Sequence, residues 1–445
     1  MSEADLIIRG GSVVMGSGVE VADVAVVGGR ITAVGPDLGS AAAEEIKASG
    51  LHVFPGGIDS HVHFNEPGRT EWETISRGSA ALAAGGYTTF IDMPLNSLPV
   101  TVDSPAFDLK LAAATSSSLI DFGLWGGLVP GNLDRLAELA ERGVIGFKAF
   151  MCPSGIDEFP ACDELTLLEG MKRIARLGSV LLVHAEDPRI LETKARSANG
   201  NGARDFVRSR PPEAEWEAIS RAVTLAAETG CRLHVVHVST ARGAEMIDEA
   251  QARGVDVSGE TCAHYLLYVE DDLVRLGGLG KCAPPFRADA DRRGLWQMLA
   301  DGRLSMVVSD HSPSTIALKQ GADFFKLWGG ISGCQSTRQL LLAKDGLDVP
   351  AIAAVTATNV ARRFGLAHKG DVAPGFDADL WLVDLAHEDV VRGNDLLYRN
   401  QFSAHEGQPI RGRTVRTMVR GRTVFADGQP VAKAAGRFIR AGARS

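Results

Sequence analysis

The feature that most constrains the fold is a regular alternation of apolar strands and amphipathic helices, which begins at about Pro55. It repeats at intervals of roughly 25 to 50 residues, as expected for parallel βα units. Eight strands alternating with helices over about 310 residues predict a (β/α)8 TIM barrel, in which functional side chains project from the carboxyl ends of the strands. The expected strands are Gly57–Phe64, Thr88–Pro94, Ile120–Leu128, Val144–Met151, Ser179–Asp187, Arg232–Ser239, Val255–Leu266 and Arg303–Pro313. Among the expected helices are Trp72–Ala84, Asn132–Arg142, Leu165–Leu177, Glu213–Thr229, Ala241–Gly254 and Ala290–Ala300.

Both chain ends have a different pattern, with short alternating strands separated by glycine-marked turns. Each end alone is too small to bury its apolar face, so the two ends are predicted to pair into one small β-sandwich beside the barrel. The expected domains are therefore residues 1–53 with 373–445 for the sandwich, and residues 54–372 for the metal-dependent barrel.

Ionisable residues gather at the predicted strand ends. His61 and His63 stand two residues apart at the end of the first barrel strand, so both imidazoles can reach one metal ion. For an isolated pair, packing in a core is an equally good explanation. The later strands carry further candidates: Lys148 in the fourth, His184 ending the fifth, His237 ending the sixth and Asp310 ending the eighth. Packing or chance would have to place each of these ionisable residues independently, which makes a functional site the better explanation.

Four histidines, one carboxylate and one lysine exceed the needs of a single tetrahedral metal and suit two metals with a bridging ligand. Lys148 has three possible roles: a nucleophilic amine, a salt-bridge partner, or a lysine carboxylated by carbon dioxide that offers two oxygens to two metals. The carboxylated form fits best beside the histidines, because burial would lower the lysine pKa and expose the neutral amine. Asp310 is the candidate to move a proton from water to a leaving nitrogen, so hydrolysis is the indicated reaction class.

At these residues the chain resembles the cyclic amidohydrolases of the amidohydrolase superfamily, and among them the allantoinases most closely. The resemblance covers essentially the whole chain. It implies two divalent metal ions, with Zn²⁺ preferred over Co²⁺, Mn²⁺ or Fe²⁺, and carboxylation of Lys148. The family motif ETCPHYL has Ala263 in place of its proline here, which affects only the expected loop shape. The implied ligands are His61, His63, Lys148, His184, His237 and Asp310, with Asp310 also catalytic.

The resemblance implies hydrolysis of allantoin to allantoate, with substrate contacts from Asn65, Asn96, His264 and Ser312. Dihydroorotases usually have an arginine where this chain has Asn65, which favours a neutral ring. Hydantoinases and dihydropyrimidinases usually have a tyrosine shortly after the metal lysine, and that tyrosine is absent. These cyclic amidases remain alternatives. A non-catalytic scaffold of the dihydropyrimidinase-like type is a further alternative, disfavoured by the six retained ligands.

Charge and composition restrict the partners. A net charge of −9 disfavours nucleic acid and anionic membranes as partners. The N-terminal segment lacks the pattern of a signal peptide, so a cytoplasmic enzyme with a small-molecule substrate is expected. Six widely spaced cysteines without a CxxC motif predict reduced thiols. The apolar content of helices such as Glu213–Thr229, together with the resemblance, predicts a homotetramer.

Overall fold

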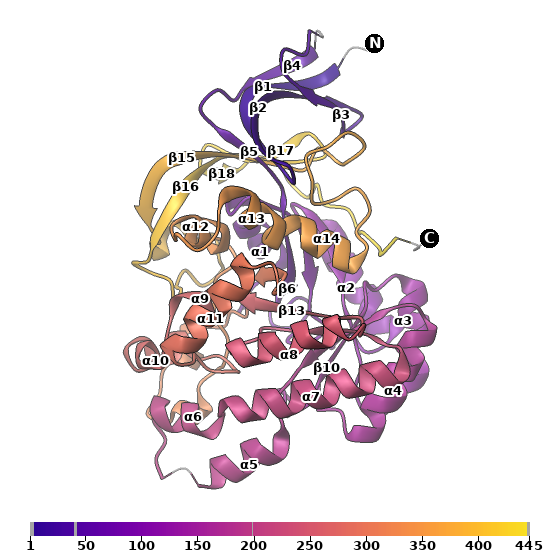
Figure 1. Cartoon of the computed structure of the whole chain (residues 1–445), viewed down its shortest axis with the longest axis vertical. Coiled ribbons are helices and arrows are strands. Elements are labelled where there is room, and N and C mark those ends of the chain that lie inside the picture. Colours follow the sequence, from indigo (N-terminus) through magenta and orange to yellow (C-terminus); the bar gives the residue numbers. More distant parts are fainter. Residues whose placement is uncertain (1–3, 40–41, 198, 443–445) are drawn as a thin grey trace.

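The computed structural model describes residues 4–39, 42–197 and 199–442. The strands of the two chain ends lie together at one end of the molecule, and the helices and parallel strands of the intervening chain form the rest (Figure 1). The predicted α/β architecture with parallel strands is therefore confirmed.

The parallel strands form two hydrogen-bonded groups, with the orders β6-β7-β8 and β14-β13-β12-β11-β10-β9. All pairings within these groups are parallel, so the carboxyl ends of the strands point the same way. The strands are β6 (Gly57–Val62), β7 (Tyr87–Asp92), β8 (Asp121–Leu124), β9 (Gly126–Gly127), β10 (Phe147–Phe150), β11 (Val180–His184), β12 (Arg232–Val235), β13 (Val257–Cys262) and β14 (Met306–Val308).

Backbone contacts join the two groups of strands in two places. Ile145, just before β10, donates its N–H to Leu124 O in β8 at 2.9 Å. At the other side, Val62 of β6 forms a parallel bridge with His311, which follows β14, and His63 N donates to His311 O at 2.8 Å. The first and last parallel strands of the sequence therefore lie next to each other.

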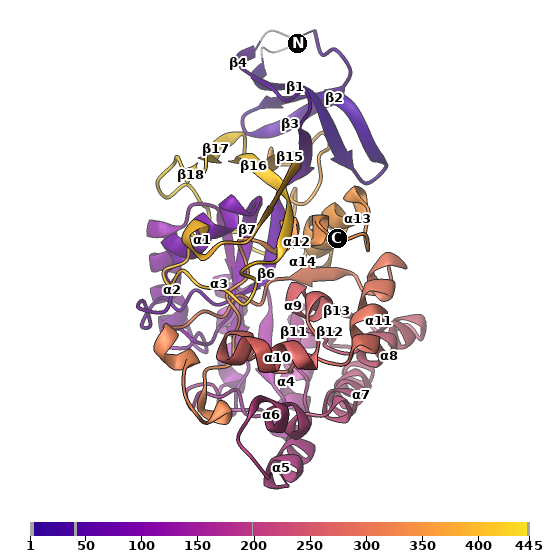
Figure 2. The ribbon, with the colours of Figure 1, turned by 90° about the vertical axis from the view of Figure 1, so that its left-hand side faces the viewer.

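Helices cover the outside of the parallel strands, with α1 and α2 on one side and α7, α8 and α11 on the other (Figure 2). The helices are α1 (Ile75–Ala84), α2 (Ser104–Ser117), α3 (Leu136–Arg142), α4 (Glu164–Arg176), α5 (Pro188–Arg196), α6 (Ala203–Ser209), α7 (Pro212–Thr229), α8 (Ala241–Ala252), α9 (Ala263–Leu267), α10 (Glu270–Leu276), α11 (Asp289–Ala300), α12 (Thr337–Leu342), α13 (Val349–Ala353) and α14 (Asn359–Phe364).

Helix α4 illustrates why these segments are helical. The Asp163 carboxylate accepts a hydrogen bond from Thr166 N and so caps the first turn. Leu167, Met171 and Ile174 are buried at spacings of four and three residues, which places them on one face of the helix. The helix therefore buries one apolar stripe against the strands and leaves charged residues outside.

Strands from both chain ends join one sheet of order β18-β17-β16-β15-β5-β1-β2-β3, with β4 paired to β1. The central link is the antiparallel pairing of β15 with β5. A separate apolar cluster includes Leu6, Val24, Val53, Leu380 and Met418, which come from both ends of the chain. The strands are β1 (Ala4–Met15), β2 (Gly18–Val27), β3 (Arg30–Gly35), β4 (Ala42–Lys47), β5 (His52–Pro55), β15 (Leu380–Val390), β16 (Pro409–Val419), β17 (Arg422–Ala426) and β18 (Gln429–Pro430).

The predicted strands all extend past the observed ones, the last two most clearly, and helices α1 and α3 start later than predicted, α3 at Leu136 rather than Asn132. The strand expected over Val255–Leu266 ends at Cys262, and α9 begins at the next residue, because a short apolar run does not by itself distinguish strand from helix. The strand expected over Arg303–Pro313 is limited to β14, and Asp310 beyond it has φ +45°, which is incompatible with a strand. Helix α1 begins at Ile75 rather than Trp72, because Thr74 caps it.

The six cysteines are buried and none is bonded to another. Within the described ranges, no helix combines the length and apolar character needed to cross a membrane.

Candidate metal centre

The carboxyl ends of the parallel strands bring the predicted ligands to one region. His61 lies within β6 and His63 just beyond it, Lys148 lies in β10, and His184 is the last residue of β11. A cavity of about 750 Å³ opens at these strand ends. Five of the six predicted ligands line it: His61, His63, His184, His237 and Asp310.

His61, His63 and Asp310 form the tightest group. Asp310 Oδ1 lies 3.2 Å from His61 Nε2 and 3.5 Å from His63 Nε2. One possible ligand atom from each residue lies within 4.8 Å of the other two, which makes the group a candidate metal site. Burial alone would raise the pKa of Asp310, but the adjacent His61 and His63 hold it well below its usual range, so the carboxylate is ionised.

His184 and His237 form a second pair beside this group. His184 Nδ1 lies 3.0 Å from His237 Nε2, and the ring centroids of His237 and His61 are 5.5 Å apart. Burial lowers the pKa of His63, His184 and His237, so their imidazoles are neutral at pH 7 and can bind a metal. Both His237 and Asp310 have positive φ, at 38° and 45°, a strained conformation that tends to occur at functional sites.

Lys148 is buried with its ammonium nitrogen 5.1 Å from the centre of the Phe150 ring. Burial lowers the pKa of Lys148 to about 7, although the charges of Glu260 and Asp310 oppose the shift. A substantial fraction of this amine is therefore neutral at physiological pH.

The sequence reasoning missed Glu260, a fully buried carboxylate in β13. Glu260 Oε1 accepts a hydrogen bond from His61 Nδ1 at 2.6 Å, and Oε2 lies 3.1 Å from His234 Nε2. Burial raises the pKa of Glu260, but His61 and His234 together lower it to about 2. An ionised partner on Nδ1 leaves the Nε2 lone pair of His61 directed toward Asp310. The available signal was a glutamate inside a strand that has no other charged residue.

The predicted substrate contacts divide into two groups. Asn96 and Ser312 line the cavity, and the Asn96 amide lies 3.2 Å from His63 Nδ1 and 3.5 Å from Ser312 Oγ. Asn65 and His264 are buried and are not among the residues of the cavity wall. Asn65 instead donates its amide to Pro313 O at 3.3 Å. Neither ring nitrogen of His264 has a hydrogen-bond partner among the described residues.

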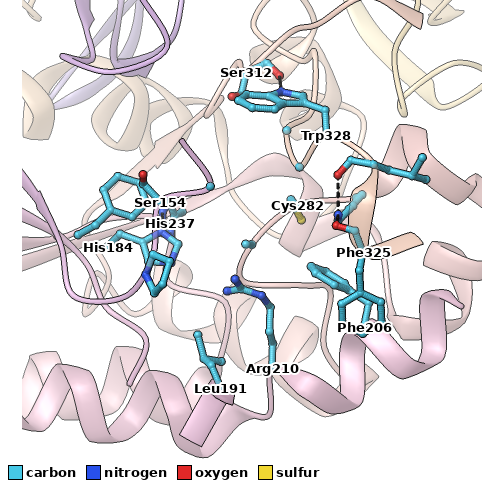
Figure 3. A pocket seen from close by; sticks show the side chains of 18 of the residues that line it. Ser154, His184, Leu191, Phe206, Arg210, His237, Cys282, Ser312, Phe325 and Trp328 are labelled. Carbon is cyan, nitrogen blue, oxygen red and sulfur yellow. Dashed lines mark hydrogen bonds between the residues drawn. The ribbon is translucent and has the colours of Figure 1, made fainter. Parts of the chain in front are cut away.

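The rest of the cavity wall combines aromatic and aliphatic side chains with cationic ones, among them Lys281. His184 and His237 face the cavity from one side, and Phe206 and Phe325 lie on the side opposite these histidines (Figure 3). Trp328 and Ser312 form a third edge. Arg210, which the sequence reasoning also missed, extends into the space between them (Figure 3). A small ring can therefore reach the histidines while its outer part contacts aromatic and cationic side chains.

Comparison with known proteins agrees with this geometry. The chain is 54% identical to an allantoinase of Rubrobacter xylanophilus, covering 99% of this chain and 98% of that protein. It is 51% identical to an allantoinase of Solibacter usitatus, covering 98% and 97%. An allantoinase of Escherichia coli K12 is 42% identical, with 98% of each chain covered.

Solved structures resemble the chain over the same length. An L-hydantoinase (dihydropyrimidinase) from Arthrobacter aurescens gives a TM-score of 0.95 at 33% identity, covering 98% of this chain and all of that one. A dihydropyrimidinase from Brevibacillus agri gives 0.91 at 30% identity, with 99% of each chain covered. Residues 52–424, which include every predicted ligand, match the amidohydrolase family. The chain therefore belongs to the amidohydrolase family.

Proposed function

We propose that the chain is an allantoinase, which hydrolyses the ring amide of allantoin to give allantoate. The observation that carries this proposal is identity of 42–54% to allantoinases over nearly the whole chain. The His61, His63 and Asp310 cluster in the cavity supports a metal-dependent hydrolysis.

The residues of the cluster fit divalent metal ions. Neutral imidazoles and an ionised carboxylate are the donors that Zn²⁺ prefers, and His237 Nδ1 is buried without a hydrogen-bond partner among the described residues. Two divalent ions, with Zn²⁺ as the preferred metal, would lower the pKa of a water molecule and polarise the amide carbonyl. The proposed ligands are His61, His63, Lys148, His184, His237 and Asp310.

Lys148 is proposed to act as its carbamate. Its neutral amine, favoured by a pKa of about 7, would attack carbon dioxide to form an N–C bond and release one proton. The resulting carbamate anion offers two oxygens as metal ligands, whereas the protonated lysine amine could not bind a metal. Elemental analysis of protein prepared with metal and bicarbonate should approach two metal ions per chain, and a value fixed at one in excess metal would contradict the two-metal arrangement.

Asp310 is proposed to accept the proton of the attacking water and to donate it to the ring nitrogen as the amide bond breaks. Its position 3.2 Å from His61 Nε2 and at the cavity wall supports this role. The apolar side chains around the cavity limit access of bulk water to the reacting amide.

A neutral substrate is favoured over dihydroorotate. Asn96 and Ser312 offer uncharged hydrogen-bonding groups beside His63, and Asn65 provides no cation where dihydroorotases usually have an arginine. His264 is proposed as a further polar contact, since its ring nitrogens are unpartnered among the described residues.

Hydantoin hydrolysis is the second candidate, because the solved structures named above are hydantoinases and dihydropyrimidinases. Each unpaired buried donor that would otherwise bind the ureido arm of allantoin costs about 1–3 kcal/mol. Hydantoin, which lacks the arm, should therefore have a kcat/KM at least about tenfold lower than allantoin. A panel of allantoin, hydantoin, dihydrouracil and dihydroorotate tests this, and equal values or a preference for another ring would contradict allantoin as the substrate.

We also propose a domain arrangement and an assembly for the chain. The bridge between Val62 and His311 and the hydrogen bond between Ile145 and Leu124 support closure of the strands into a (β/α)8 barrel over residues 54–372. The separate apolar cluster of the end strands supports a β-sandwich domain of residues 1–53 and 373–445. We propose a homotetramer as the assembly, on the basis of the apolar content of the outer helices.

A further inference from the structure

Glu186 connects the proposed ligand His184 to Arg210, an arginine that lines the cavity. The carboxylate is fully buried, and its Oε2 accepts a hydrogen bond from His184 Nε2 at 2.7 Å. The same oxygen accepts a close hydrogen bond from Arg210 Nη1. One buried oxygen therefore contacts both the metal-site histidine and the cavity arginine.

The contact with Glu186 determines which ring nitrogen of His184 is free to bind a metal ion. Arg210 donates to the same Glu186 oxygen that contacts His184 Nε2, so this oxygen acts as an acceptor toward both neighbours. His184 Nε2 must then carry the proton, and the Nδ1 lone pair faces His237 at 3.0 Å. The Phe150 ring stacks on the His184 ring at 4.6 Å and 14°, which limits its rotation. Glu186 and Phe150 together fix both the tautomer and the orientation of the ligand.

Arg210 is itself held in place. Its carbonyl oxygen accepts a close hydrogen bond from Arg287, whose Nε donates to Ser239 Oγ at 3.0 Å. The guanidinium lies 5.6 Å from the centre of the Phe206 ring. Since the side chain is 20% exposed and extends into the cavity (Figure 3), donors not used by Glu186 can reach a ligand there.

The charges at this pair indicate the kind of ligand group that fits. Glu186 already balances the charge of Arg210, so Arg210 itself offers no unpaired positive charge to an anionic group. A neutral carbonyl oxygen can accept the remaining N–H donors without requiring such a charge. Because His184 lies where the reacting amide is expected, Arg210 is suited to the outer part of the substrate.

We propose that Glu186 is a positioning residue for His184, and that Arg210 donates hydrogen bonds to the carbonyl oxygen of the substrate's ureido arm. The assignment of the arm rests on the proposed allantoinase function. The assignment of Glu186 rests only on its contacts with His184 and Arg210. The two parts are therefore tested with separate readouts.

Metal release tests the role of Glu186. In Glu186→Gln, the neutral amide should hold His184 less well, and release of the bound metal to a chromophoric chelator should be about 10–100-fold faster than in wild type. Glu213→Gln, an exposed substitution on α7, is the matched control and should release metal at the wild-type rate. Arg210→Lys retains a cation beside Glu186 and should release metal within about threefold of wild type. A wild-type release rate in folded Glu186→Gln would overturn the positioning role.

Substrate selectivity tests the role of Arg210. Arg210→Lys loses the planar fork of donors, so kcat/KM for allantoin should fall at least about tenfold while that for hydantoin changes less than about twofold. Arg208→Lys, an exposed substitution at the end of α6 just before Arg210, is the control and should change neither value. Equal losses for both substrates, or no loss for allantoin, would overturn the ureido contact. If wild type does not hydrolyse allantoin, the proposed function itself fails, and the metal-release rates still decide the role of Glu186.

Discussion

Lys110→Met tests how the backbone that follows His61 and His63 is held. Lys110 Nζ, from α2, donates to Asp92 Oδ2 at 2.6 Å and to Met93 O at 2.7 Å. The other oxygen of Asp92 accepts a hydrogen bond from Phe64 N at 2.9 Å, directly after His63. This ion pair therefore connects an outer helix to the chain that carries two proposed ligands.

Both charged side chains are only 1% exposed, so the pair is screened little by solvent. Methionine preserves much of the volume of the lysine stem but removes the cation, which leaves the Asp92 carboxylate buried with the Phe64 N–H as its remaining donor. Removal of one partner from a buried ion pair costs about 3–5 kcal/mol. The double variant Asp92→Asn/Lys110→Met removes both charges and should be more stable than Lys110→Met alone.

The assay is urea unfolding of metal-free protein, with the loss of stability taken from the midpoint shift of the first transition multiplied by its slope. Lys172→Met is the control, because Lys172 is 44% exposed and pairs with Glu169 on the surface of α4. Its expected effect is within about 0.5 kcal/mol. A loss below about 1 kcal/mol for Lys110→Met, or a double variant no more stable than the single one, would refute the reasoning.

Three further predictions concern the reaction and the assembly. Asp310→Asn retains an oxygen ligand but cannot accept a proton, so kcat should fall by about 10²–10⁴-fold. A variant with more than a tenth of the wild-type kcat would exclude Asp310 as the general base. Lys148→Ala should lose metal and activity together, and short carboxylic acids should restore part of both if the lysine serves as a carboxylate carrier; activity without bound metal would contradict this role. Light scattering at micromolar concentration should give about four times the chain mass of 47.1 kDa, whereas a value near the chain mass would refute the tetramer.

The sequence could predict those site residues whose positions follow directly from the geometry of the strands. His61 and His63 are separated by two residues, and that spacing alone orients both side chains toward one face. His184 and Asp310 could be placed at the same edge, because consecutive parallel strands all end there. The cavity that five of the six predicted ligands line follows from this topology.

The partners of these ligands could not be predicted, because they depend on contacts between distant parts of the chain. Glu260 lies 199 residues from His61, and no local pattern links the two. Arg210 follows a short helix, and its position in the cavity depends on Arg287, 77 residues later. Asn65 was predicted to contact substrate, but its positive φ of 60° and its hydrogen bond to Pro313 O depend on a loop conformation that residue type alone does not define.

The central claim is that the cavity at the strand ends hydrolyses allantoin with bound metal. The most direct measurement is the rate of allantoate formation by metal-loaded protein, by the same preparation after chelation, and after metal is restored, with metal content determined at each stage. We predict allantoate formation that is lost with the metal and returns when metal is restored. Failure of metal-loaded protein to form allantoate, or an unchanged rate in protein shown to be free of metal, would contradict it.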